Sequence, residues 1–283
     1  MDRTALQLGL QRFIVGLAKK VLVANVVAAA FPITGTDPWT TASAWLALLA
    51  YTVQIYFDFS GYSDMAIGLG QMMGFHFPEN FNRPYTARSF TDFWRRWHMT
   101  LSFWMRDYLY IGLGGNRRGE VRTYANLLTV FVISGFWHGA SWNFLFWGLF
   151  HGLFLVLERA FLLRWLQQLP PLLAKVWTFF WVVLGWALFA LVDPTALKEF
   201  LQALFGFGGV PLGINHIALD REAAFTLLLA AALLFLPAYR WWAMAVRASS
   251  TGVRSTVAHL LLAVLSLSYL AGATFNPFIY FRF

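Results

Sequence analysis

The sequence predicts an all-α, polytopic membrane protein, and three observations support that fold class. Hydrophobic residues make up 59% of the 283 residues, charged residues make up 12%, and the mean hydropathy is +0.59. Soluble domains carry about twice that charged fraction. Apolar stretches of the length needed to cross a bilayer recur along the chain. The basic residues lie between those stretches rather than in one patch, which favours a topological role and argues against nucleic acid as a partner.

About seven transmembrane helices are expected. The apolar stretches cover residues 13–31, 41–59, 123–140, 142–162, 176–192, 223–239 and 257–274. The segment 61–75 is apolar but short, and Gly68, Gly70 and Gly74 interrupt it. It therefore predicts a re-entrant or tilted helix that packs closely against its neighbours through small residues. Residues 1–283 are expected to form a single membrane domain.

The distribution of lysine and arginine predicts the orientation of the chain. If the N-terminus and the segments 76–122, 163–175 and 240–256 share one side, 18 of the 21 basic residues lie there. Only Lys198, Arg221 and Arg282 then lie on the other side. Positive charge marks the cytoplasmic side of a membrane protein. The 193–222 loop and the tail 276–283 are therefore expected to face outward.

The segment 76–122 is polar enough to lie outside the bilayer core. Pro78 and Pro84 predict an ordered turn, and a helix is expected from about Thr91, with Ser89 or Thr91 as its N-cap. Helical spacing would place on one aromatic face Trp94, Trp97, His98, Leu101, Trp104, Met105 and Tyr108. Because the arginines of this segment lie off that face, the pattern favours an interfacial amphipathic helix.

Three histidines are candidates for chemistry. His138 ends a hydrophobic helix between Gly135 and Gly139, and imidazole is the natural general base near neutral pH; a helix-end histidine bonded to a carbonyl is an equal alternative. His98 could be a second base, a group that orients the first, or a contact to an acyl carbonyl, and taken alone it favours a structural role. For His151 a packing or hydrogen-bonding role is favoured. A metal site is not expected, because no carboxylate stands at ligand spacing. The absence of cysteine excludes thiolate chemistry.

Two further clusters carry charge. Asp58 and Asp64 lie at the inner end of the second stretch, where a structural ion pair is favoured over a proton relay. The expected partners are Arg83, Arg88, Arg95 or Arg96. The turn Gly114–Gly119 could cradle phosphate through backbone amides and guanidinium groups. It matches no P-loop spacing, so a plain cytoplasmic turn is the alternative.

Several motifs in this order resemble the membrane-bound O-acyltransferases, and most closely their bacterial alginate O-acetylation branch. They are Tyr56–Gly68, Phe77–Phe81, Asp92–His98, Trp104–Tyr110, Gly114–Arg117 and Gly135–Gly139. The ending Asn276–Phe283 is similar to that branch as well. The number and order of the motifs over residues 10–160 make the resemblance specific.

The resemblance implies an O-acyltransferase in the bacterial inner membrane, with its helices around a central tunnel. It implies that His138 is the catalytic residue and His98 the second active-site residue. Acetyl-CoA on the cytoplasmic side would be the donor, with no permanently bound cofactor. The acetyl group would pass to an alginate-like polysaccharide outside, through a periplasmic acetyltransferase partner. We expect the CoA phosphates near Arg95, Arg96, Arg117 and Arg118.

The chain is shorter than the family that it resembles. Family members carry further spanning helices before the first stretch, so this chain resembles their C-terminal part: a truncated gene model, a fragment or half of a split enzyme. Two other functions stay open. One is D-alanyl or other acyl transfer to a cell-envelope polymer such as teichoic acid. The other is a non-catalytic transport subunit, in which the histidines and Asp58 form a polar pathway.

Overall fold

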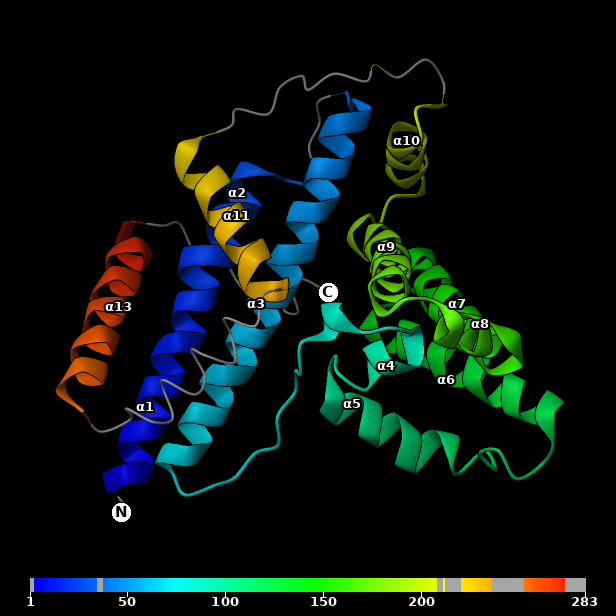
Figure 1. The fold of residues 1–283 in the computed structure, drawn as a ribbon, viewed down its shortest axis with the longest axis horizontal. Helices are drawn as coiled ribbons and strands as arrows, with labels where there is room; N and C mark the ends of the chain where they lie inside the picture. The colour runs from blue at the N-terminus through cyan, green and yellow to red at the C-terminus, as the bar shows by residue number, and fades with distance from the viewer. Residues whose placement is uncertain (1–2, 35–37, 208–210, 212–219, 236–251, 273–283) are drawn as a thin grey trace. The chain divides into compact units, whose positions relative to one another are not determined.

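The computed structural model describes residues 3–34, 38–207, 211, 220–235 and 252–272. Within these ranges the chain forms helices and no strand, so the all-α prediction is confirmed (Figure 1). The chain divides into two compact units. The first consists of Met1–Pro32, Ala50–Glu79 and Ile217–Phe283, and the second of Ile33–Leu49 and Asn80–His216. Each is described by itself, and the single domain stays a prediction.

Each of the seven predicted spans is helical over most of its described residues, and the described residues that are not helical lie at span ends, at 31, 139–140 and 191–192. Four helices are long and apolar enough to cross a membrane: Arg3–Ala30, Trp142–Gln168, Pro171–Ala190 and Val253–Gly272. The first combines α1 (Arg3–Ala18), a π-helical turn η1 (Lys19–Ala24) and α2 (Asn25–Ala30). The last two are α9 and α13. The other three predicted spans fall in α3 (Thr41–Met72), α6 (Glu120–His138) and α11 (Arg221–Phe235), and residues 236–239 and 273–274 lie outside the described residues.

The prediction of a separate re-entrant segment over 61–75 is wrong, because this segment continues α3, a helix of 32 residues. Gly61 and Gly68 face α1, Gly70 faces the ring of Phe77, and Gly74 follows the end of α3. A Cβ atom added to Gly16 would lie 2.5 Å from the carbonyl oxygen of Gly61, and one added to Gly9 would lie 2.6 Å from that of Gly68. The two helices are antiparallel and side by side (Figure 1). The prediction of close packing through small residues is confirmed.

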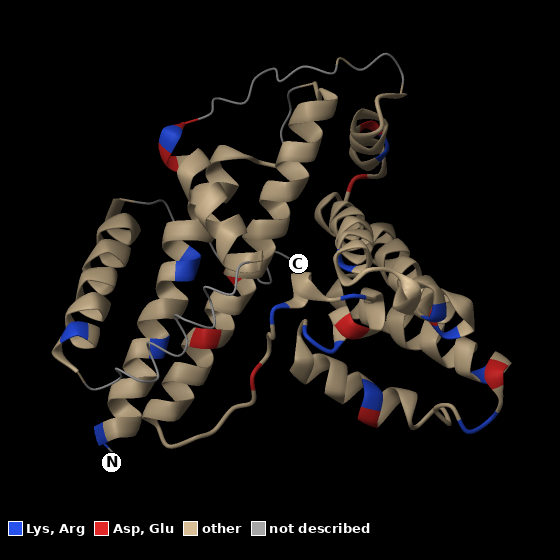
Figure 2. Cartoon of the chain, viewed as in Figure 1, with Lys and Arg blue, Asp and Glu red and all other residues tan. Residues whose placement is uncertain are grey.

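Ion pairs join α1 to α3, in agreement with the structural interpretation of the two aspartates. Asp58 accepts a buried hydrogen bond from Lys20, and Asp64 lies 2.9 Å from Arg12 and 2.5 Å from Lys19. These cations come from α1 and η1, which sequence reasoning did not name as partners. A π-helical turn carries one extra residue, which lets both lysines reach α3. Figure 2 shows these basic residues along α1, inside a helix rather than in a loop.

The second unit is built on an antiparallel pair of helices, α6 and α7 (Trp142–Leu157), which continues through η4 (Glu158–Leu162) and α8 (Leu163–Gln168). A Cβ atom on Gly135 would lie 2.2 Å from the carbonyl oxygen of Phe144, and one on Gly148 would lie 2.3 Å from that of Phe131. Against α7 of this pair pack α9 and the short α4 (Phe90–Trp94). The largest fully buried side chains of this unit are aromatic: Trp97, Trp147, Trp186, Phe90, Phe93, Phe189 and Phe200.

A continuous helix from Thr91 was predicted, and that prediction is wrong. The helix α4 ends at Trp94, α5 (Met99–Trp104) begins after a break, and a π-helical turn η3 (Met105–Tyr110) follows. The predicted N-cap is confirmed at Ser89, whose hydroxyl accepts a 3.0 Å bond from the Asp92 amide. The aromatic residues do not share one face, because Trp97 is 1% exposed whereas Trp104 is 53% exposed.

Candidate functional site

His98 stands at the break between α4 and α5, and Asn80 holds it there. The backbone of His98 is left-handed, with φ 45° and ψ 54°. The side-chain oxygen Oδ1 of Asn80 lies 3.1 Å from Nδ1 of His98 and accepts hydrogen bonds from the amide and the hydroxyl of Thr100 at 3.3 and 3.0 Å. The Met99 amide donates to the carbonyl oxygen of Asn80 at 3.0 Å. One asparagine therefore fixes both the backbone and the side chain of His98.

The same contacts assign the tautomer of His98. A backbone N–H can only donate, so the asparagine atom that faces the Thr100 amide must be the oxygen. His98 must then carry its proton on Nδ1, and Nε2 carries the lone pair of the ring. Sequence reasoning assigned no role to Asn80. Its only signal was its place in the proline-bounded turn, close before the helix that it holds.

His138 is the last residue of α6 and is 9% exposed. Its ring lies in an aromatic enclosure, with ring centroids 5.1 Å from Trp147, 5.2 Å from Phe189 and 6.3 Å from Phe144. Gly139 ends the helix, and a Cβ atom there would lie 2.7 Å from the Phe144 ring. The glycine thus allows the phenyl ring to close over the histidine. Gly135 on the other side of His138 likewise permits close approach of protein groups, here the backbone of Phe144.

The structure brings His98 and His138 to one indole. The centroid of the Trp137 ring lies 6.5 Å from that of His98 and 4.9 Å from that of His138. Burial, and secondarily the charge of His138, lowers the pKa of His98 to about 3. His98 is therefore neutral near pH 7 and able to accept a proton. Trp137 was noted only as part of a motif, and its position between the histidines was not foreseen.

His151 shares the ring of Trp147 with His138. Its ring is fully buried, with centroids 4.9 Å from Trp147 and 5.0 Å from Trp94. Among the described residues neither ring nitrogen has a hydrogen-bond partner. A Cβ atom added to Gly185 would lie 2.9 Å from Nε2, so α9 passes directly against the imidazole. These contacts support the packing interpretation of His151.

The four arginines proposed for CoA phosphates lie in two segments. Arg95 and Arg96 follow α4, and Arg96 is held by Asp92 at 2.7 Å, whereas Arg95 is exposed. Arg117 and Arg118 are exposed in the loop between η3 and α6. Across the described residues no group of three or more histidines or carboxylates is arranged to hold a metal ion.

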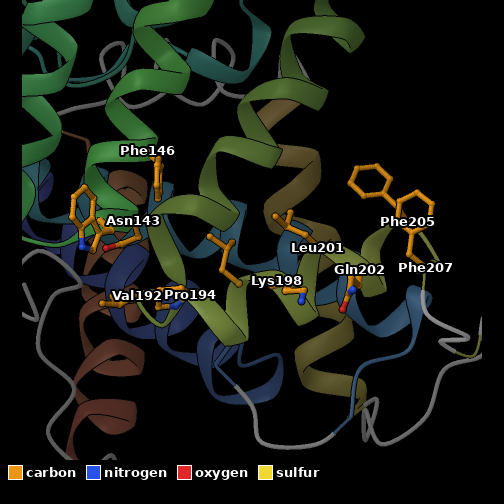
Figure 3. Close-up of a pocket in the computed structure, with 11 residues that line it drawn as sticks. Asn143, Phe146, Val192, Pro194, Lys198, Leu201, Gln202, Phe205 and Phe207 are labelled. Atoms are coloured by element: carbon orange, nitrogen blue, oxygen red, sulfur yellow. The ribbon is translucent and has the colours of Figure 1, made fainter.

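A separate cavity of about 430 Å³ lies between the start of α7 and α10 (Pro194–Leu204), both in the second unit (Figure 3). Its lining is largely apolar, with Asn143, Lys198 and Gln202 as its polar residues. Asn143 donates a 3.3 Å bond to the carbonyl oxygen of Leu188. Neither His98 nor His138 lines this cavity, so it is distinct from the histidine pair.

Comparison with known proteins identifies a family and several relatives. The model of the membrane-bound O-acyltransferase family matches residues 4–193. The probable alginate O-acetylase of Azotobacter vinelandii is 41% identical over an alignment of 312 positions. The alignment covers 97% of this chain and 62% of the relative. The protein of the same name from Pseudomonas aeruginosa is 47% identical over 78% of this chain and 43% of its own length. The peptidoglycan O-acetyltransferase of Helicobacter pylori is 46% identical over 72% of this chain. This chain therefore spans at most 62% of the length of these relatives.

Proposed function

Because the chain belongs to the membrane-bound O-acyltransferase family, we propose that it carries the acyl-transfer site of a cell-surface O-acetyltransferase. The donor is acetyl-CoA on the cytoplasmic side, the immediate acceptor is a hydroxyl group, and the acetyl group is destined for an extracytoplasmic, alginate-like polysaccharide. The observation that carries the proposal is the meeting of two histidines, His98 and His138, at the indole of Trp137. The names of the relatives support O-acetylation of a surface polymer.

His138 acts as the general base. Its imidazole takes the proton of the acceptor hydroxyl, and the oxygen attacks the carbonyl carbon of the thioester. The tetrahedral intermediate collapses, and the bond between carbon and sulfur breaks. The thiolate of CoA leaves and receives the proton from the His138 imidazolium, which restores the base. Such proton transfer contributes a rate factor of about 10²–10⁴.

His98 supports this step through Nε2. Because Asn80 accepts the Nδ1 proton, a neutral His98 offers only a lone pair toward the site. A lone pair cannot donate a hydrogen bond to a developing oxyanion, but it can accept one from a hydroxyl. We therefore assign His98 to orienting the acceptor hydroxyl or sharing its proton, and not to stabilising the tetrahedral intermediate.

The surroundings of the site supply binding. The exposed guanidinium groups of Arg95, Arg117 and Arg118 suit the phosphates of CoA, with Arg96 restrained by Asp92. In this proposal the protein is located in the bacterial inner membrane. It passes the acetyl group on to the polysaccharide through a periplasmic acetyltransferase. The remaining helices of the longer relatives would complete the wall of the tunnel.

Complementation of a strain that lacks its alginate O-acetylase tests the proposal. The strain receives this chain, or this chain joined to the preceding part of the Azotobacter vinelandii relative, each with and without His138→Ala. His76→Ala, at an exposed histidine, is the matched control. We expect polysaccharide acetylation with the joined protein and its His76→Ala form, and none with His138→Ala. Acetylation that persists in the His138→Ala protein would overturn the assignment of the base.

A further inference from the structure

Glu158 is a buried carboxylate that the acyl-transfer chemistry does not use. Its side chain is 2% exposed, and it opens the π-helical turn η4 at the end of α7. One carboxylate oxygen accepts a hydrogen bond from the Phe90 amide. The other accepts bonds from the amide and the hydroxyl of Thr91, at 2.8 and 2.7 Å. Sequence reasoning singled out no role for this residue.

These bonds tie the long α7 helix to the beginning of α4. Amides in the first turn of a helix have no partner within the helix, and a negative charge there is favourable. The π-helical turn carries an extra residue, so the helix can direct Glu158 toward α4 without ending. Phe90 stacks on Phe154 of α7 with centroids 4.3 Å apart and planes 4° apart, which fixes the same junction from its apolar side.

The tie matters because α4 leads directly to His98. This helix has only 5 residues, and so short a helix is not stable without tertiary contacts. The segment from Ser89 to Thr100 is held at its start by Glu158 and at its end by Asn80. His98 lies between these two anchors in a left-handed conformation that it would not adopt unaided.

We propose that Glu158 is a positioning residue for His98, which it places by anchoring the start of α4. It contacts neither the acyl donor nor the acceptor. The consequence for turnover rests on the acyl-transfer function proposed above, whereas the consequence for the position of His98 does not. Two readouts therefore separate a failure of this inference from a failure of the function.

The first readout is the rate at which diethyl pyrocarbonate modifies His98 in the detergent-purified protein, measured by mass spectrometry. Exposed His76 serves as the internal reference. Glu158→Gln keeps the size of the side chain but turns one acceptor into a donor, which must face the amide of either Phe90 or Thr91. Thr91→Val removes only the bond from the Thr91 hydroxyl to Glu158. It is the second test of the anchor and replaces Glu158→Gln if that variant does not fold. Arg159→Gln, at the exposed neighbouring residue, is the matched control.

We expect Glu158→Gln to change the His98 rate severalfold relative to His76, Thr91→Val to change it less, and Arg159→Gln to leave it unchanged. The second readout is acetyl transfer per folded molecule by the joined protein. A reacting group displaced by about 1 Å costs about 100-fold in rate, so kcat should fall by about 10-fold or more in Glu158→Gln. An unaltered His98 rate in folded Glu158→Gln and Thr91→Val would overturn the positioning role. An inactive parent protein with a changed His98 rate would count against the proposed function alone.

Discussion

Replacing Asn80 with alanine tests whether one side chain holds His98 in its functional conformation. The substitution removes the acceptor of three donors, namely Nδ1 of His98 and the amide and hydroxyl of Thr100. It leaves intact the backbone bond from Met99 to residue 80. The expected result is a loss of both the fixed tautomer and the left-handed backbone at His98.

The magnitudes favour that outcome. Each neutral hydrogen bond contributes about 1 kcal/mol net, so the three bonds to Asn80 supply about 3 kcal/mol. The left-handed conformation of a residue with a Cβ costs about 1–2 kcal/mol. With Asn80 present the bonds exceed the cost, and without it the balance reverses. A change of about 3 kcal/mol shifts the conformational ratio by about 100-fold, toward the continuous helix that the sequence pattern favours.

The assay combines two measurements on purified protein in detergent. Nitrogen chemical shifts of labelled histidine report the tautomer of His98, and hydrogen exchange reports the protection of the Thr100 amide. Asn82→Ala is the matched control, because both recorded bonds of Asn82 use its backbone. We expect a mixed tautomer and at least tenfold faster exchange in Asn80→Ala, and wild-type behaviour in Asn82→Ala. An Nδ1-protonated His98 and a protected Thr100 amide in Asn80→Ala would refute the reasoning.

Three further predictions concern stability. Lys20→Met removes the ammonium group that pairs with the buried Asp58 and should lower the free energy of unfolding by about 3–5 kcal/mol. The added change Asp58→Leu should recover most of this loss in denaturant titrations, and a double variant as unstable as the single one would argue against the ion pair. Gly16→Ala places a Cβ atom 2.5 Å from a backbone oxygen of α3. It should lower the free energy of unfolding by about 1–3 kcal/mol, which is measured as a lower melting temperature. Gly272→Ala, where an added Cβ atom meets no atom within 4 Å, should melt like the wild type. The pKa of His98 falls from 6.5 to about 3 on folding. Between these pH values the unfolded chain binds a proton that the folded chain does not, so stability is lost as the pH falls through this window. His98→Gln should flatten the pH dependence of the free energy of unfolding there, and an unchanged slope would contradict this.

The sequence was sufficient for the fold class and for the candidate histidines. Every apolar stretch that was predicted to span the membrane falls in a helix. Apolar length is a local signal, because a bilayer demands about 20 apolar residues whatever the partner helices are. The sequence placed His138 at the end of a helix, and His138 is the last residue of α6. It also placed Ser89 correctly as a helix cap. These features depend on local chemistry, which the sequence displays directly.

Features that depend on distant residues could not be predicted from local patterns. Helical spacing gave one continuous aromatic helix through His98, but Asn80 breaks it with hydrogen bonds from another segment. Gly68 of α3 resembled an interruption of the helix, but it is the point at which α1 packs against α3. The π-helical turns, one of which brings Glu158 to α4, have no signature in the hydrophobic period. In each case a tertiary contact overrides the local preference.

The central claim is that His98 and His138 act in one acyl-transfer site. The most direct test is transfer of radiolabelled acetyl from acetyl-CoA to polysaccharide by membranes that contain the joined protein, His98→Ala, His138→Ala and the double variant. Residues that act as a unit give non-additive losses. We predict that His138→Ala lowers the rate by about 100-fold or more and that adding His98→Ala lowers it little further. Losses that multiply in the double variant, or full activity of His138→Ala, would contradict the shared site.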